Sequence, residues 1–104
     1  MYTVLDVSSL EGRRKPIARA IGARAIRLNR FDSQPGQAGF AHDERESGQE
    51  EIYVPIAGAG VLRIGGEEIA LAPGLFVLVT ADESRQVIAG GEGLTYLVVG
   101  AASG

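Results

Sequence analysis

Residues 36–58 read GQAGFAHDERESGQEEIYVPIAG, and this stretch decides the fold of the chain. Five residues separate Gly36 from His42, and six separate Glu51 from Gly58. His42 and Glu44 are two positions apart, so in a β-strand their side chains point to the same face. If that strand pairs with the strand that carries Glu51, one imidazole and two carboxylates converge. The spacing therefore predicts a metal-site frame on adjacent β-strands, with His42, Glu44 and Glu51 as candidate ligands of a divalent ion.

Short apolar segments separated by glycine and proline make up most of the chain, and no long stretch has the period of a helix. The segment Ile17–Ile21 fits either a helical turn or an extended segment. This pattern predicts an all-β fold, either a barrel or a sandwich. The expected strands are residues 2–7, 24–31, 39–43, 51–56, 61–64, 67–71, 75–79, 85–89 and 94–99. The expected turns are residues 33–36, 58–60, 65–66, 73–74 and 90–93.

The chain has 104 residues and no cysteine, which suits one small domain with a single core and a reducing cytoplasm. Its net charge of −3 argues against a nucleic-acid partner. Seven of the ten basic residues lie within the first thirty positions, whereas acids gather at 43–51. These regions are either two solvated surfaces or complementary patches across a homodimer. Neither a secretory signal pattern nor a membrane-spanning apolar run is present, so we expect a cytoplasmic protein without a membrane partner.

The stretch from residue 36 to residue 99 resembles the cupin family of small double-stranded β-helix (jelly-roll) barrels. The family's first motif has a glycine, two histidines, a glutamate and a second glycine on neighbouring strands. The matching residues here are Gly36, His42, Glu51 and Gly58, with Glu44 at the place of the second histidine. The turn at residues 72–74 matches the one between the family's two motifs. The resemblance implies one cupin domain over residues 1–104, with its core at about 24–100 and an N-terminal extension at 1–23.

Arg85 falls where the family's second motif has a histidine, and Ala89 falls where it has an asparagine. A guanidinium stays protonated and has no lone pair for a metal, so Arg85 cannot serve as a ligand. Beside Glu44 and Glu51, it would instead neutralise one carboxylate through an ion pair. The resemblance therefore implies a half-kept metal motif in which Arg85 fills the electrostatic role of the ion.

The resemblance also implies a small-molecule ligand inside the barrel. The candidate ligand-binding residues are His42, Tyr53, Arg85 and Tyr96. Each has a structural alternative: His42 as a hydrogen-bonded rim histidine, the two tyrosines as core, and Arg85 as a salt-bridge partner rather than an anchor for a ligand carboxylate. Cupins of this size often form homodimers in which an N-terminal strand joins the partner's sheet, so we expect residues 2–7 to do so.

Two functional classes follow from these residues. The first is a small stand-alone binding barrel of uncertain role that holds a small molecule, such as a carboxylic acid, beside a degenerate metal site. The second is a metal-dependent enzyme of the isomerase, epimerase or dioxygenase type, in which His42, Glu44 and Glu51 hold Fe, Mn, Ni, Cu or Zn. A weaker third class is an oligomerisation or regulatory module. The missing histidines favour the first class, and the sequence leaves open whether the protein is an enzyme.

Overall fold

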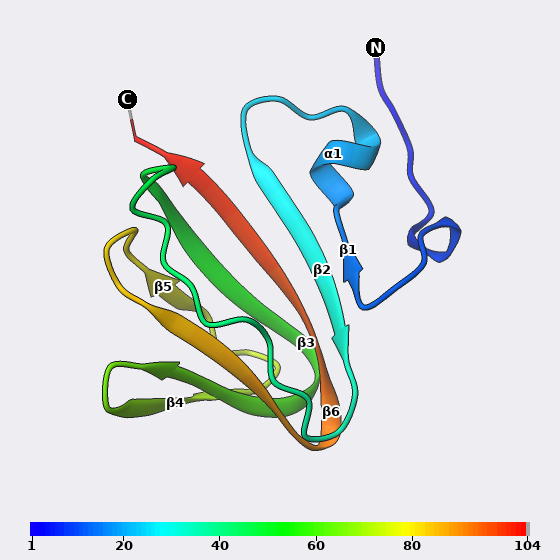
Figure 1. The fold of residues 1–104 in the computed structure, drawn as a ribbon. Coiled ribbons are helices and arrows are strands. Elements are labelled where there is room, and N and C mark those ends of the chain that lie inside the picture. The colour runs from blue at the N-terminus through cyan, green and yellow to red at the C-terminus, as the bar shows by residue number, and fades with distance from the viewer. Residues whose placement is uncertain (104) are drawn as a thin grey trace.

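The structure, a computed structural model that describes residues 1–103, contains one antiparallel sheet built around two long strands (Figure 1). These strands are β3 (Gln49–Ile64) and β6 (Arg85–Ala102). The shorter elements are the 3-10 helix η1 (Val7–Ser9), β1 (Arg14–Lys15), the helix α1 (Ile17–Ile21), β2 (Arg27–Ser33), β4 (Glu67–Leu71) and β5 (Val77–Val79). The strand order is β1–β2–β6–β3–β4, and β5 pairs with β3. The prediction of an all-β fold is confirmed.

The two faces of β3 differ as the two-residue period of a strand requires. Glu51, Tyr53 and Pro55 are buried on the inner face, whereas Ile52 and Ile56 are exposed on the outer face. Glu51, Tyr53 and Pro55 therefore share the inner face of β3. No helix within residues 1–103 has the length and apolar character needed to span a bilayer.

The backbones of the two long strands come very close in a glycine-rich region, which comprises residues 58–60 of β3 and residues 90–93 of β6. The register between β3 and β6 shifts just before and just after Gly58. A Cβ atom on Gly58 would lie 2.2 Å from the carbonyl oxygen of Gly93, and Gly58 has a φ of +77°. The predicted turns at 58–60 and 90–93 are wrong, because both segments are parts of continuous strands with irregular pairing. Glycine marks bulges here rather than chain reversals.

The core lies between parts of the sheet on either side of this glycine-rich region. Tyr53 and Leu62 belong to different halves of β3, yet both are in one buried cluster. The full cluster is Tyr53, Leu62, Leu71, Val79, Val87, Ala89, Leu94, Tyr96 and Val98. The sheet must therefore fold back on itself, since a flat sheet could not bring these side chains into one core.

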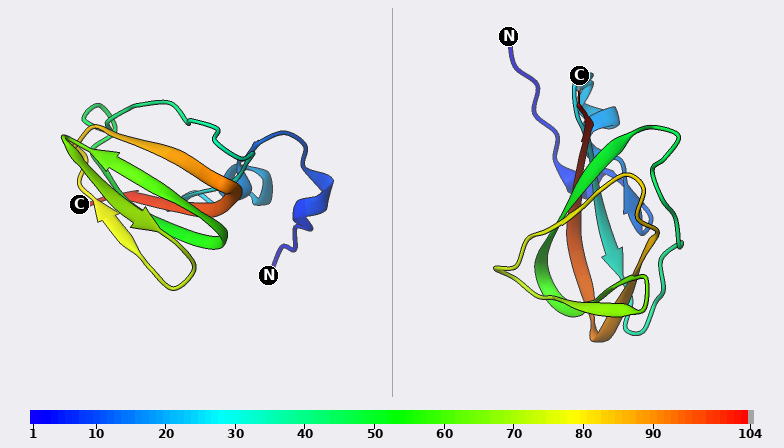
Figure 2. Two further views of the ribbon diagram at one scale, coloured as in Figure 1. Left: turned by 90° about the horizontal axis from the view of Figure 1, so that it is seen from below. Right: turned by 90° about the vertical axis from the view of Figure 1, so that its left-hand side faces the viewer.

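Several predicted elements are different in the structure. Residues 2–7 form no strand before η1, and Tyr2 is exposed; Figure 2 shows this N-terminal segment standing away from the strands. Residues 39–43 do not form a continuous strand, because this stretch bridges β6 only at isolated points. The predicted strand at 75–79 is shortened to β5, and Ile17–Ile21 is the short helix α1. The predicted hairpin at 65–66 is confirmed, since it joins β3 to β4.

Replacing Gly58 by alanine tests the close approach between the long strands. The Gly58→Ala change is expected to lower the free energy of unfolding by at least about 2 kcal/mol, because it adds a clash to an unfavourable φ. Gly66→Ala is the matched control, since a Cβ there has no atom within 4 Å. Urea unfolding followed by circular dichroism measures both. Equal unfolding midpoints for the two variants would contradict the close approach.

Candidate functional site

His42 is held opposite Arg85, at the start of β6. The backbone N–H of His42 donates to the carbonyl of Arg85 at 3.0 Å, and the N–H of Arg85 donates to the carbonyl of His42 at 2.8 Å. Glu51, in contrast, pairs with Val79 and Gly100. The pairing on which the predicted convergence was conditional, between the segment of His42 and the strand of Glu51, is therefore absent from residues 1–103. Their side chains nevertheless lie 3.5 Å apart, with the His42 side chain 41% exposed and that of Glu51 6% exposed.

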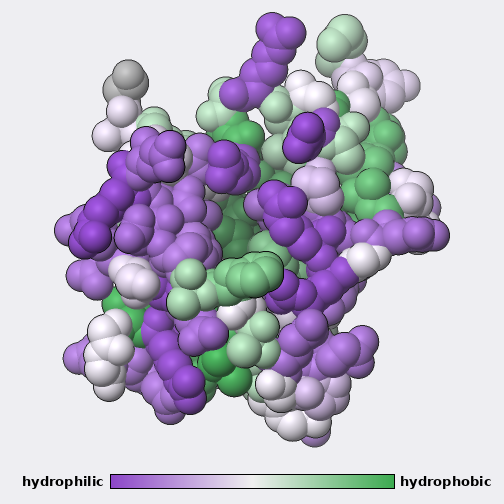
Figure 3. All heavy atoms as spheres, in the orientation of Figure 1, coloured by the Kyte–Doolittle hydropathy of each residue, from purple (hydrophilic) through white to green (hydrophobic). Residues whose placement is uncertain are grey.

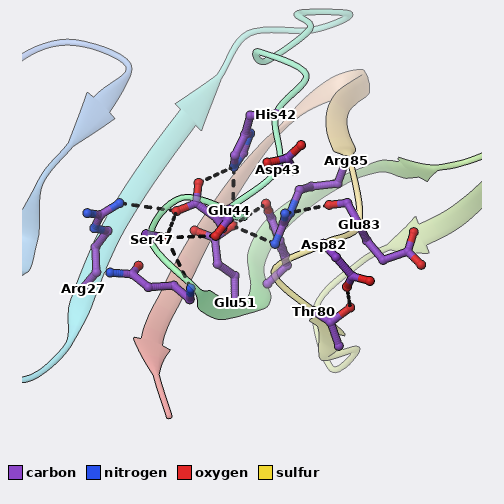
Figure 4. Close-up of polar contacts among 12 residues, drawn as sticks. Arg27, His42, Asp43, Glu44, Ser47, Glu51, Thr80, Asp82, Glu83 and Arg85 are labelled. Atoms are coloured by element: carbon purple, nitrogen blue, oxygen red, sulfur yellow. Dashed lines mark hydrogen bonds and ion pairs between the residues drawn. The ribbon is translucent and has the colours of Figure 1, made fainter. Parts of the chain in front are cut away.

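Three of the predicted site residues approach one oxygen of Glu51 (Figure 4). Tyr53 donates its hydroxyl hydrogen to Glu51 Oε1 at 3.0 Å. His42 Nε2 and Arg85 Nη2 each lie 3.5 Å from the same oxygen. Glu51 is only 5% exposed, so these neighbours replace the water that the carboxylate has lost.

The ionisation of Glu51 and His42 is coupled through this contact. Burial raises the pKa of Glu51, but the His42 and Tyr53 contacts and the charge of Arg85 outweigh burial and leave the pKa below its ordinary value. The contact with Glu51 raises the pKa of His42 above its ordinary value, against the opposing effect of burial. The geometry thus favours a charged carboxylate and makes the imidazole easier to protonate.

Glu44 completes a cluster with His42 and Glu51, called here the His–Glu cluster. Its Oε2 lies 3.5 Å from His42 Nε2, and its side chain is 14% exposed. Ser47 donates its hydroxyl hydrogen to Glu44 Oε1 at 2.9 Å, and Arg27 Nη1 lies 3.7 Å from the same oxygen. The predicted common direction of His42 and Glu44 is therefore confirmed, and Glu44 is more buried than a rim residue in solvent would be.

The side chain of Arg85 is completely buried next to Glu51. Its side chain has no exposed surface, and Nη1 donates to the carbonyl of Glu83 at 2.7 Å. Nε and Nη2 are buried and make no hydrogen bond within residues 1–103. Arg85 is not among the residues that line the cavity described next. This position suits an ion pair with Glu51 better than direct contact with a ligand.

A cavity of about 380 Å³ opens beside the His–Glu cluster. In Figure 3, hydrophobic surface is visible in recesses between the hydrophilic side chains that cover most of this face. Tyr53 and Tyr96 belong to the core cluster, as one of the two predicted alternatives for these tyrosines has it, and they also line the cavity. Phe31 stacks on Tyr96 with ring centroids 5.0 Å apart, and Tyr53 lies 6.3 Å from Tyr96. Burial raises the pKa of Tyr96 to about 12, so its hydroxyl stays protonated as a donor.

The cavity wall also contains residues that the sequence analysis did not select. Five of these residues lie near the N-terminal segment and on β2: Arg13, Arg14, Arg27, Asn29 and Phe31. Arg27, Asn29 and Phe31 alternate along β2, so the two-residue period could have identified them as one inward face. No local pattern marks Arg13 and Arg14, which were assigned to a basic surface region.

The His–Glu cluster could hold a metal ion, because one ligand atom from each residue lies within 4.8 Å of the others. An imidazole nitrogen and two carboxylate oxygens are donors that divalent ions accept. However, Arg85 Nη2 lies 3.5 Å from the Glu51 oxygen that already accepts from Tyr53, and its charge would repel a dication. Within residues 1–103 the group has no fourth His, Cys, Asp or Glu ligand. The residues therefore fit a divalent ion only in part.

Solved structures from several bacteria have the same fold. A cupin protein from Bacteroides fragilis is 23% identical with a TM-score of 0.85, and the match covers 99% of this chain and 86% of that chain. A sugar phosphate isomerase of the cupin superfamily from Silicibacter pomeroyi is 21% identical with a TM-score of 0.77, covering 96% of this chain and 76% of that chain. A predicted oxalate decarboxylase from Thermotoga maritima is 24% identical with a TM-score of 0.69, covering 83% and 74%, respectively.

No protein-family model and no curated protein matches the sequence. At these identities, the structural similarities establish the fold alone. The chain has a cupin fold, as the resemblance of residues 36–99 implied.

His42 is the only histidine, so its titration can be followed by one NMR signal in protein freed of metal by chelator. We expect a pKa above the ordinary value of about 6.5, and a lower pKa in Glu51→Gln, because the contact with Glu51 favours the imidazolium. By linkage, this contact contributes stability below the unfolded-state pKa and loses it as pH rises through the folded-state pKa. An unchanged His42 midpoint in Glu51→Gln would show that the two groups do not interact.

Proposed function

From the cupin fold and the residues that line the cavity, we propose that the protein binds a small organic acid and needs no metal to do so. The observation that carries the proposal is the charge of the cavity wall, which has three arginines and two glutamates. With a neutral His42, this leaves one positive charge in excess. An anion is the ligand that this wall would favour.

The His–Glu cluster fits this proposal as a degenerate metal site. Arg85 supplies a permanent positive charge beside Glu51, where a complete site would have an ion. Arg27 provides a weaker partner for Glu44 at 3.7 Å. Both carboxylates thus have a cation nearby without any metal, which supports a binding role over catalysis by a bound ion.

The size and lining of the cavity indicate the kind of molecule that would enter. About 380 Å³ lies near the lower end of the range for small-molecule sites, roughly 300 to 1,000 Å³. The stacked rings of Phe31 and Tyr96 offer a flat apolar surface for the body of the ligand. Of the predicted ligand-binding residues, His42, Tyr53 and Tyr96 would contact it, whereas Arg85 would act through Glu51.

A metal-dependent enzyme is the second candidate function. It is favoured by the convergence of the His–Glu cluster within 4.8 Å, and two of the similar structures are described as a sugar phosphate isomerase and a predicted oxalate decarboxylase. Fe, Mn, Ni, Cu or Zn bound there would polarise a substrate oxygen. The charge of Arg85 argues against this candidate, as described above.

A thermal-shift series on chelator-treated protein tests both candidates. We expect small carboxylic acids to raise the melting temperature and their neutral amides to leave it unchanged. An acid at 100 times its dissociation constant should stabilise the fold by about 2.7 kcal/mol. If no acid among those tested has an effect, the acid-binding proposal fails.

The metal content of the purified protein tests the metal-dependent enzyme in a separate experiment. Elemental analysis of protein purified without chelator is expected to show well under one equivalent of transition metal per chain. About one equivalent, lost in His42→Ala, would support the metal-dependent enzyme instead.

We also propose that the protein is a homodimer, as the sequence analysis expected. The outer face of the sheet carries a cross-strand row of apolar residues, Leu78, Ile52, Val99 and Leu28, on β5, β3, β6 and β2. Leu78 is 57% exposed and Ile52 is 39% exposed. A second copy covering this row would remove apolar surface from water. A cytoplasmic location, and a domain with its core at about 24–100 and an extension at 1–23, remain predictions.

Light scattering after size exclusion separates the two routes to a dimer. If the outer face is the interface, Ile52→Lys with Leu78→Lys should give a monomer, because each copy would bury two lysine charges against those of its partner. If residues 2–7 join the partner's sheet, a chain lacking residues 1–8 should give the monomer instead. A monomeric unmodified protein at micromolar concentration would contradict both.

A further inference from the structure

Arg13 and Arg14, in the segment before α1, reach the cavity without a carboxylate partner. Both line the cavity, and neither makes a salt bridge to any other residue within 1–103. The other cavity-lining arginine, Arg27, faces Glu44. The excess positive charge of the cavity is therefore concentrated at the end formed by the N-terminal segment.

The backbone and the side chain of Arg13 both make contacts that hold the residue in this position. Its carbonyl accepts a hydrogen bond from the backbone N–H of Asp32 at 2.9 Å. Its guanidinium carbon lies 5.7 Å from the ring centroid of Phe31. Its Nη1 is buried and has no hydrogen-bond partner within residues 1–103. A buried donor without an acceptor is costly, and a ligand oxygen would remove that cost.

Other polar groups approach the same point of the cavity. A Cβ atom placed on Gly39 would lie 3.8 Å from Arg13 Nη1 and 4.0 Å from the Tyr96 hydroxyl oxygen, so these two groups are near each other. Asn29 is 7% exposed and lines the cavity. Arginine, amide and phenol groups can all donate to one anion.

We infer that Arg13 and Arg14, with Asn29 and Tyr96, form a subsite for the anionic group of the ligand. This inference rests on the proposal that the cavity binds a small acid. A carboxylate or a phosphate monoester presents the oxygens that an arginine fork binds. The anion anchor therefore lies in the N-terminal segment and on β2 and β6, not at Arg85.

The subsite also defines the orientation of the ligand in the cavity. The ring of Phe31 stacks on Tyr96, and Tyr96 lies beside Tyr53, whose hydroxyl reaches Glu51. An anion at Arg13 would place the body of the ligand along these rings. The far end would then face carboxylate oxygens of the His–Glu cluster, which accept hydrogen bonds. The ligand class is a small organic anion with a hydroxyl or amino group at its other end.

Calorimetric titration with four probes tests the subsite: 4-hydroxybenzoate, 4-hydroxyphenyl phosphate, inorganic phosphate and the neutral 4-hydroxybenzamide. The unmodified protein is expected to bind at least one anionic probe and to bind it more weakly at high salt. Arg13→Gln with Arg14→Gln should weaken that binding at least tenfold and reduce its salt dependence, with little change for the amide. Arg19→Gln with Arg24→Gln is the matched control, because these two arginines belong to the same basic region but do not line this cavity.

The outcomes separate the subsite from the proposed function. Full affinity for the anionic probe in Arg13→Gln with Arg14→Gln overturns the subsite and leaves acid binding standing. Equal losses in the control pair also overturn it, since they indicate a general charge effect. If the unmodified protein binds no anionic probe, the proposed function and the subsite fail together. Arg14→Gln alone, at an exposed position, repeats the test if the double variant is unstable.

Discussion

The burial of one carboxylate against a fixed cation is the constraint on which the site depends. Glu51 and Arg85 are both removed from solvent, and a lone charge of either sign there would be strongly unfavourable. Arg85 is held by the carbonyl of Glu83 and, through its own backbone, holds His42. One residue thus neutralises Glu51, positions the imidazole and closes the space behind the cluster. The charged groups of the His–Glu cluster can therefore remain next to the cavity in a largely buried position.

The glycine-rich region of the two long strands provides the geometry that makes such an interior available. Gly58 and Gly60 on β3, and Gly90 on β6, let the backbones of the two strands approach closer than any side chain would permit. The sheet can then fold over a single core, in which Tyr53 and Tyr96 serve as both packing and cavity wall. The site is therefore not an addition to the fold, because its lining residues also hold the two halves of the sheet together.

Local periodicity predicted the side-chain directions well and the chain path less well. The inward direction of Glu51 and Tyr53 follows from the two-residue period of β3. His42 and Glu44 do approach each other as predicted, although neither lies in a continuous strand. The pairing of His42 with Arg85 joins positions far apart in sequence, so no local pattern encodes it. Glycine occurs in turns and in bulges alike, which is why the sequence predicts chain reversals at 58–60 and 90–93, where the strands are continuous. The path of Arg13 depends on a tertiary contact with β2 and could not be inferred from its neighbours.

The positive charge beside Glu51 is covalently part of the polypeptide. A coordinated ion can be stripped by a chelator, exchanged for a competing ion or, for iron and copper, change oxidation state. A guanidinium undergoes none of these changes, and it remains charged throughout the pH range of living cells. The charge that Arg85 contributes to this pocket is consequently set when the chain is translated, whatever the supply of trace elements around it.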